Sequence, residues 1–466
     1  MKRVARIFFS TAIAFGFLCF CQYQCKAQAK PPNIIVIVAD DMGYADIGVH
    51  GSKDIPTPNI DSLAKAGVRF TDAYVSGPYC SPTRAGLMTG RYPQRFGHEF
   101  NILGRQAGHS DVGLPLTETT MADRLKSAGY NTALIGKWHL GSAARFHPMQ
   151  RGFQEFFGFL DGQHSYISPT VTDVNPLYDG KDIVAEKAYL TDVLADRAAD
   201  FIKRKRTQPF FLYLAFNAVH LPMEATEKYM ARFAHSADER RRTYAAMLSA
   251  MDDGIGKTVA ALRDQNLEEN TLIFFFSDNG GPTIYGGLNG SSNAPLRGSK
   301  RTTWEGGIRV PFIVQWKGRI AGGKTYSQPI IQLDVLPTAL AAAGIKLQEQ
   351  SNLDGVNLLP FLADKTSGRP HEILYWRLGG ILALRKGDWK LVKMTETGFQ
   401  EEPAALKDLS GLDLYNLKDD IGETKNLASQ RPKKVKEMAA TWQRWTKGLA
   451  KPGWLPPTLR VGGLAP

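Results

Sequence analysis

Two pairs of oxygen-bearing side chains stand directly after two strongly apolar runs. Asp40 and Asp41 follow NIIVIVA, and Asp278 and Asn279 follow TLIFFFS. Carboxylate and amide oxygens bind hard divalent cations such as Ca²⁺ and Mg²⁺, whereas Zn²⁺ prefers His and Cys. A single Asp-Asp pair is commonly a solvated turn or a helix cap, but two acidic run ends that meet would repel each other without a cation. The sequence therefore predicts a site for Ca²⁺, with Mg²⁺ as the alternative.

A second group of side chains carries positive charge or can take it up: Arg84, Lys137, His139, His220 and Lys300. Each alone carries little information, because a surface Lys is usually solvated and most histidines are structural. His139 follows Lys137 by two, so both side chains would leave the same face of an extended segment. Cationic donors grouped around a metal fit a substrate that is a small oxyanion.

The N-terminal segment MKRVARIFFSTAIAFGFLCFCQYQCKAQAK has the features of a secretory signal. Three basic residues precede an apolar stretch over residues 7–21, and Ala27-Gln28-Ala29 is a small-x-small cleavage pattern. The alternative is a membrane anchor, but 15 apolar residues are fewer than the roughly 20 that span a bilayer. We therefore expect residues 1–29 to be a signal peptide and the mature protein to be exported, periplasmic or secreted.

Cys80 lies in GPYCSPTRAGLMTGRYP and is the only cysteine outside the predicted signal, which contains Cys19, Cys21 and Cys25. Exported proteins usually pair their cysteines, so a single one is unusual. Cys80 cannot form a disulfide within the mature chain. A role other than a structural one is indicated.

The chemistry-bearing residues must be positioned by strands, because each group follows an apolar run. Besides the two runs above, NTALIGKWH leads to Lys137 and His139, and PFFLYLAFNAVHLP leads to His220. Runs that are apolar on both faces are typical of buried parallel strands. Amphipathic segments such as NIDSLAKAG and AYLTDVLADRAADFIKRK alternate with them. We predict an α/β fold, a mostly parallel sheet between helices, with its ligand site at the carboxyl ends of the strands.

After about residue 370 the pattern changes to ILYWRLGGILALRKGDWKLVKM and LDLYNLKDD, which indicate antiparallel strands, and then to a terminal helix in PKKVKEMAATWQRWTKGLA. We expect a catalytic domain over residues 30–365 and a smaller α+β subdomain over 366–466. The net charge of +12 falls to about +8 without the signal. A basic balance favours acidic partners, but no long basic run, zinc pattern or nucleic-acid module is present, so nucleic acid is not expected as a partner.

These motifs resemble the formylglycine-dependent sulfatases of the alkaline-phosphatase superfamily. CSPTR, from Cys80 to Arg84, matches the Cys-x-Pro-x-Arg sequence in which a maturation enzyme converts the cysteine to formylglycine. The further matches, which extend the resemblance over residues 33–428, are AGLMTGRYP, IVADDMGYADIG, GKWHLG, SDNGG, LRGSKRTTWEGGIRVP and LYNLKDDIGETKNLA.

The resemblance implies an alkaline-phosphatase-like fold and a role for each matched residue. Asp40, Asp41, Asp278, Asn279 and the modified residue 80 would bind the cation, and Arg84 would hold the formylglycine. The residues that would contact the sulfate or assist proton transfer are Lys137, His139, His220 and Lys300. A formylglycine hydrate offers one hydroxyl to attack sulfur and a second whose deprotonation, by His139, releases sulfate; His220 would protonate the departing alcohol.

The resemblance and the basic surface together predict exo-acting desulfation of a sulfated carbohydrate. His98, Asn101 and His164 are candidates for sugar contacts, and for each a structural role is an equal alternative. Two other functions stay open: a phosphodiesterase or phosphonate monoester hydrolase on the same scaffold, and a protein that binds sulfated glycans without cleaving them.

Overall fold

The computed structural model describes residues 30–103, 111–167, 175–284, 288–346, 352–401, 403, 406 and 409–456. The predicted signal peptide lies outside these residues. Within the described ranges, no helix combines the length and apolar character needed to cross a membrane. The described residues from Pro31 onward belong to one compact unit.

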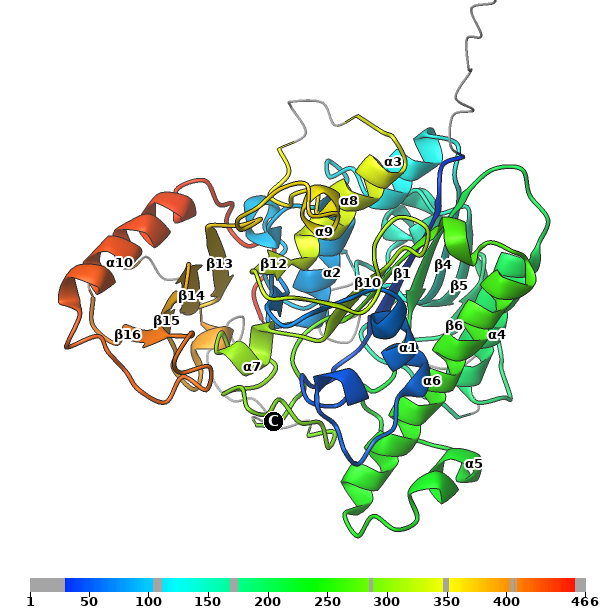
Figure 1. Ribbon diagram of the computed structural model, residues 1–466, viewed down its shortest axis with the longest axis horizontal. Helices are drawn as coiled ribbons and strands as arrows, with labels where there is room; N and C mark the ends of the chain where they lie inside the picture. The colour runs from blue at the N-terminus through cyan, green and yellow to red at the C-terminus, as the bar shows by residue number, and fades with distance from the viewer. Residues whose placement is uncertain are drawn as a thin grey trace, which may run out of the picture. The chain divides into compact units, whose positions relative to one another are not determined.

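A ten-stranded sheet forms the centre of this unit (Figure 1). Its five central strands, β9-β1-β8-β4-β5, are all parallel, and antiparallel pairs occur only toward the two edges. The strand order is β11 (Lys324–Tyr326), β2 (Val68–Phe70), β10 (Phe312–Gln315), β9 (Thr271–Ser277), β1 (Asn33–Ala39), β8 (Phe210–Ala215), β4 (Asn131–Lys137), β5 (Glu155–Phe159), β6 (Leu177–Asp179) and β7 (Asp182–Val184). The predicted mostly parallel α/β sheet is confirmed.

The central strands are buried on both faces, as their unbroken apolar runs predict. Alternate residues of β1 enter two different cores: Ile35 and Ile37 pack with α1 (Pro58–Ala66), α4 (Leu190–Lys203) and α6 (Glu239–Asp264). On the other face, Ile34 and Val36 share a core with α2 (Cys80–Thr89), α3 (Met121–Ser127) and α8 (Val335–Ala342). Helices therefore cover both faces of the sheet.

The C-terminal part carries a four-stranded antiparallel sheet, β13 (Ile373–Leu378), β14 (Ile381–Lys386), β15 (Trp389–Lys393) and β16 (Asp413–Asn416). Helix α10 (Pro432–Thr446) covers one face through Val435, Met438 and Trp442. Gly387, with φ 60°, forms the tight turn between β14 and β15 that the Lys-Gly-Asp sequence predicts. The antiparallel sheet is confirmed, whereas the boundary near residue 365 stays a prediction.

Smaller elements complete the fold. β3 (Ala73–Tyr74) pairs with β12 (Ile330–Ile331), and α5 (Glu227–Met230), α7 (Glu305–Ile308) and α9 (Leu359–Leu362) are single-turn helices. A buried ion-pair cluster ties α7 to the C-terminal sheet, because Lys390 Nζ on β15 lies 2.8 Å from Glu305 Oε1 and 2.9 Å from Glu423 Oε1. This cluster fixes the segment that follows Lys300 against the second sheet.

Candidate active site

Four neighbouring strands bring the predicted residues to one edge of the sheet. In the order β9, β1, β8, β4, their carboxyl ends lead to Asp278 and Asn279, to Asp40 and Asp41, to His220, and to Lys137. Short hydrogen bonds tie these ends together: Asp40 N donates to Ala218 O at 2.9 Å, and Asp278 N donates to Ala39 O at 3.1 Å. The site is therefore built on the central parallel strands of the sheet.

Cys80 begins α2 and enters this edge from one face. Its Sγ lies 3.5 Å from Asp40 Oδ1 and 4.0 Å from Asp41 Oδ1, and the residue is fully buried. Arg84 lies one helical turn further on, so it shares the face of α2 that carries Cys80. Arg84 donates to Asp278 Oδ2 and, through Nη1, to Lys137 O at 3.2 Å.

Three buried carboxylates face three buried cations. Lys137 Nζ lies 2.5 Å from Asp40 Oδ2, and Lys300 Nζ lies 2.7 Å from Asp41 Oδ1. Arg84 pairs with Asp278 at 2.8 Å. Because the opposite charges are equal in number, a bound divalent cation would make the site positive overall, which suits an anionic substrate.

Burial and these neighbours shift the acid–base properties of the cluster. Burial and the charge of Asp40 raise the pKa of Asp278. Burial also opposes ionisation of Asp41, but Lys300 and His220 hold the pKa of Asp41 below its ordinary value. Burial raises the pKa of the Cys80 thiol to about 12. At neutral pH this cysteine is therefore a neutral thiol and a weak nucleophile.

The donor set fits a hard divalent cation. One atom each from Asp40, Asp41, Cys80 and His220 lie within 4.8 Å of one another. Asn279 Nδ2 donates to Asp41 Oδ1 at 2.7 Å, while Asn279 Oδ1 is buried and has no hydrogen-bond partner within the described ranges. A buried carbonyl oxygen without a donor is unfavourable unless a cation fills that role. The oxygen atoms of Asp40, Asp41 and Asn279 suit Ca²⁺ or Mg²⁺, and Asp278 Oδ1 lies beside them, where it accepts from Asp41 N at 3.3 Å.

His139 departs from its expected geometry. The inference that Lys137 and His139 leave the same face of an extended segment is wrong, because β4 ends at Lys137 and His139 has φ 58°, a left-handed conformation. His139 Nε2 lies 2.8 Å from Ile102 O. A carbonyl only accepts, so this nitrogen carries the proton, and burial first of all holds the pKa of His139 well below its ordinary value. Its Nδ1 is left with a free lone pair and is unpartnered in the part of the chain that the structure describes.

His220 lies between the acid cluster and the surface. Its Nδ1 lies 2.7 Å from Leu221 O, so Nδ1 is the protonated nitrogen of the neutral ring. Its Nε2 lies 3.5 Å from Asp41 Oδ2, and burial lowers the pKa of His220 to about 3. The side chain is 14% exposed, more than any of the charged partners around it.

The three candidates for sugar contacts lie in protein-filled surroundings. His98 is fully buried, its Nε2 lies 2.6 Å from Ser81 Oγ, and its ring packs edge-on against Trp454. Asn101 Oδ1 accepts from Ser81 N at 2.9 Å. His164 packs against Phe159 and its Nδ1 contacts Ser165 O. His98 and Asn101 hold the first turn of α2, and contact of any of the three with a sugar stays a prediction.

Sequence patterns did not reveal two residues that hold site residues in place through hydrogen bonds. Asn289 Nδ2 donates to Asp41 O and Val219 O, which fixes the left-handed backbone of Asp41 at φ 63°. Tyr213 OH, inside β8, accepts from Arg84 Nη1 at 3.3 Å. A polar group inside an apolar run was the available signal for Tyr213, whereas nothing local distinguishes Asn289.

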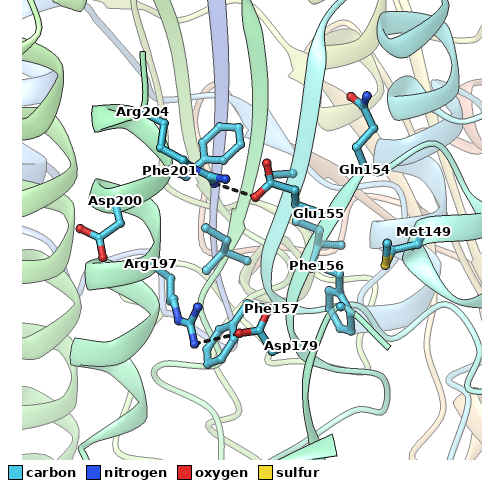
Figure 2. A pocket seen from close by; sticks show the side chains of 14 residues that line it. Met149, Gln154, Glu155, Phe156, Phe157, Asp179, Arg197, Asp200, Phe201 and Arg204 are labelled. Atoms are coloured by element: carbon cyan, nitrogen blue, oxygen red, sulfur yellow. Dashed lines mark hydrogen bonds and ion pairs between the residues drawn. The ribbon is translucent and has the colours of Figure 1, made fainter. Parts of the chain in front are cut away.

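A cavity of about 440 Å³ lies elsewhere, between α4 and strands β4 and β5 (Figure 2). Two ion pairs lie among its lining residues, Arg204 with Glu155 at 2.6 Å and Arg197 with Asp179 at 3.0 Å. None of the predicted site residues lines this cavity. It is separate from the acid cluster.

Comparison with known proteins identifies the family. The pattern of the family described as Sulfatase matches residues 32–345, which is more than half of the chain. The chain belongs to the sulfatase family. A second pattern, described as the C-terminal region of N-sulphoglucosamine sulphohydrolase, matches residues 298–447. The chain is therefore a sulfuric ester hydrolase.

Individual sulfatases are similar over most of their length. The N-acetylgalactosamine-6-sulfatase of Homo sapiens is 35% identical over 414 residues, covering 84% of this chain and 78% of that protein. The crystal structure of Ps i-CgsB in complex with k-i-k-neocarrahexaose has a TM-score of 0.83 and 37% identity, covering 92% of this chain and 96% of that one. The phosphonate monoester hydrolase of Agrobacterium radiobacter has a TM-score of 0.63 with 18% identity over 90% and 96% of the two chains, a likeness that shows the fold alone.

Proposed function

We propose that this sulfatase removes sulfate from the end of a sulfated carbohydrate. It would use a bound Ca²⁺ ion and a formylglycine, which a maturation enzyme makes from Cys80. We further propose that it acts after export, in the periplasm or outside the cell. The observation that carries the proposal is the position of Cys80 Sγ, 3.5 Å from Asp40 and within 4.8 Å of ligand atoms from Asp41 and His220.

The state of Cys80 supports its conversion. As a cysteine it is a buried thiol with its pKa raised to about 12 by burial, so little thiolate exists to attack sulfur. A hydrated formylglycine would place two hydroxyls on one carbon, one to displace the alcohol at sulfur and one to lose its proton as sulfate is released. Arg84, which is fully buried on the same face of α2, would hold one of these oxygens.

Asp40, Asp41, Asp278 and Asn279 would hold the cation. When bound, it would lower the pKa of a coordinated hydroxyl and neutralise charge that develops on the sulfate oxygens. Lys137 and Lys300, which pair with Asp40 and Asp41 respectively, would contact the sulfate. Their burial excludes water, which strengthens both interactions.

The two histidines are suited to opposite proton transfers. His220 Nε2 faces Asp41 and the open side of the cluster, and it is bare in the neutral ring. To protonate the departing alcohol oxygen, His220 would first take up a proton at Nε2, which the charge of Asp41 favours. His139 keeps a bare Nδ1 because its Nε2 proton is committed to Ile102 O. It would therefore accept the proton of the second hydroxyl when the covalent sulfate leaves.

Exo action on a carbohydrate is supported by the burial of the site residues and by the similarity of the chain to known proteins. Cys80, Arg84 and Lys137 are completely buried, so only a projecting sulfate would reach them. The similar proteins named above include an N-acetylgalactosamine-6-sulfatase and a protein crystallised in complex with k-i-k-neocarrahexaose. The basic charge of the chain agrees with an anionic substrate.

Production of the chain with and without a formylglycine-generating enzyme tests the proposal. Peptide mass spectrometry of residues 70–84 should show an aldehyde at position 80, and only that sample should release sulfate from sulfated sugars over many turnovers. Cys80→Ser should release less than one equivalent or trap a sulfated enzyme, because a serine ester lacks the second hydroxyl. Sustained turnover by Cys80→Ser would contradict the mechanism. Faster hydrolysis of phenyl phosphate than of phenyl sulfate would favour the phosphate-type hydrolase, and sugar binding without hydrolysis would favour the binding protein.

A further inference from the structure

Arg301 stands beside the proposed sulfate pocket with its side chain uncommitted. Several described arginines have a guanidinium over an aromatic ring, and Arg301 alone among them has no hydrogen-bond or ion-pair partner for its side chain within the described ranges. The others pair with carboxylates, as Arg309 does with Asp72, or donate to an oxygen, as Arg206 does to Phe201 O. A cation held in place without an acceptor is suited to a ligand that brings one.

Two aromatic rings hold this guanidinium. Its central carbon lies 5.3 Å from the centroid of Tyr79 and 5.6 Å from that of Phe399. Tyr79 directly precedes Cys80, and Phe399 comes from the C-terminal part of the chain, so Arg301 lies between segments that are far apart in the sequence. Both rings rest on an apolar cluster formed by Phe100, Ile102, Leu378, Ile381 and Trp454. The rings shield Arg301 Nε, which is buried, while the side chain as a whole stays partly exposed.

The backbone of Arg301 is also unusual. Its φ of 71° is left-handed, a conformation that is unfavourable for a residue with a Cβ. Arg301 N donates to Pro78 O at 2.8 Å, which ties this turn to the segment just before Cys80. Strained backbone that the surroundings hold in place is often found where a side chain has a binding or catalytic task.

The position of Arg301 relative to Lys300 indicates which part of a bound substrate would face Arg301. Lys300 Nζ pairs with Asp41 and lies 5.6 Å from the same Tyr79 ring that Arg301 covers. The Tyr79 ring is therefore in contact with two cationic side chains: Lys300, which faces the acid cluster, and Arg301, which faces Phe399. A sugar whose sulfate ester reaches Lys300 and Cys80 would present its neighbouring substituents to Arg301.

We propose that Arg301 is a specificity-determining residue that binds a second oxyanion of the substrate, a carboxylate or another sulfate, on the same sugar or the next one. The planar fork of a guanidinium matches such groups with two parallel hydrogen bonds, and stacking between rings fixes its orientation. This inference rests on the proposed function for its substrate, but the binding by Arg301 can be measured without hydrolysis.

Calorimetric titration of the unconverted Cys80 protein tests the inference directly. The probes are a monosaccharide monosulfate, the corresponding disulfate, and a monosulfated disaccharide that contains a uronate. Wild type should bind the disulfate or the uronate about tenfold or more tightly than the monosulfate, since a hydrogen bond between charged groups contributes this much. The probe that gains affinity identifies the second oxyanion as sulfate or carboxylate. Arg301→Asn should lose this preference.

The variants are chosen to fold. Asn tolerates a left-handed φ and removes the charge, and Arg301→Gly relieves the backbone strain, so both should keep the melting temperature of the wild type. Lys205→Asn is the matched control, because Lys205 is an exposed cation between α4 and β8, at the edge of the sheet opposite the site. Lys205→Asn should keep the preference for the second oxyanion.

Hydrolysis separates failure of this inference from failure of the proposed function. In the converted enzyme, Arg301→Asn should lower kcat/KM for the preferred dianionic sugar relative to 4-nitrophenyl sulfate by about tenfold. Equal binding of all three probes by wild type and Arg301→Asn would overturn the inference even if sulfate is released. Absence of sulfate release from every ester, with the binding preference still dependent on Arg301, would instead overturn the proposed function.

Discussion

Arg84 donates two hydrogen bonds to a single oxygen of Asp278, from Nε at 3.0 Å and from Nη2 at 2.8 Å. Both side chains are fully buried, and Asp40 Oδ2 lies only 3.7 Å from Arg84 Nη2. Arg84 therefore holds the ends of β9 and β1 together as well as lining the pocket. Its loss would leave two carboxylates close together in a dry environment.

Arg84→Met should destabilise the protein strongly. Removing one partner of a buried ion pair typically costs about 3–5 kcal/mol, because the other charge stays buried without compensation. The measurement is the free energy of unfolding from denaturant titration, with Arg232→Met as a matched control. Arg232 pairs with Asp253 at 2.7 Å, but its side chain is 40% exposed and that of Asp253 is 39% exposed. An exposed pair contributes about 0–1 kcal/mol, so equal losses in the two variants would contradict the burial argument.

Added Ca²⁺ should raise the melting temperature, and chelation should lower it. A cation that binds only the folded state stabilises it by an amount that grows with the logarithm of its concentration, about 2.7 kcal/mol at a hundred times Kd. Asn279→Ala should weaken this response, because it removes the buried Oδ1 that has no protein partner in the described residues. Asn33→Ala, at the other end of β1, is the control and should keep the response. A stronger response to Mg²⁺ than to Ca²⁺ would reverse the assignment of the ion.

Sequence alone predicted the parts of the site that depend on local signals. Asp40 and Asp278 could be placed because unbroken apolar runs identify buried strands, and the carboxyl ends of parallel strands share one edge. The residues themselves do not show that β9 and β1 are neighbours in the sheet. That adjacency follows from the fold class. Short strands such as β10 and β11 gave no comparable signal, because three or four residues carry little pattern.

Contacts between distant segments could not be predicted. His139 was expected to continue an extended strand, but its amide donates to Leu160 O at 3.0 Å and its ring to Ile102 O, which turns its backbone. The meeting of Tyr79, Arg301 and Phe399 likewise joins segments far apart in the chain. A resemblance supplies roles for matched motif residues, but it says nothing about such neighbours.

His371 should make stability depend on pH. Its Nε2 lies 2.7 Å from Asp334 Oδ1, and both side chains are mostly buried. Burial opposes the charge, but the Asp334 carboxylate outweighs it and raises the pKa of His371. Because the folded pKa lies above the unfolded value of about 6.5, the stabilisation is complete below pH 6.5 and is lost as the pH rises through the folded pKa.

His371→Gln should therefore lower the free energy of unfolding most in acid. We expect a difference from wild type of about 1–3 kcal/mol near pH 6, the range for a hydrogen bond to a charged group. The difference should shrink at higher pH, where wild-type His371 is neutral. Denaturant titrations between pH 5.5 and 9 measure it. A difference that grows with pH would mean that His371 is held neutral in the folded protein.

His220→Ala should slow the enzyme in proportion to how poorly the alcohol leaves. A sugar alkoxide needs a proton as the S–O bond breaks, whereas an activated phenolate leaves without one, so the loss should be about 10²–10⁴-fold for sugar sulfates and far smaller for activated phenyl sulfates. Measuring kcat/KM for phenyl sulfates of graded phenol pKa gives this dependence as a slope. His139→Ala is the matched control: His139 would act after the alcohol has gone, so its loss should slow the release step of all substrates alike. If His220→Ala lowered kcat/KM equally across the series, its Nε2 would not be the acid, and its contact with Asp41 at 3.5 Å would have to serve the cation site instead.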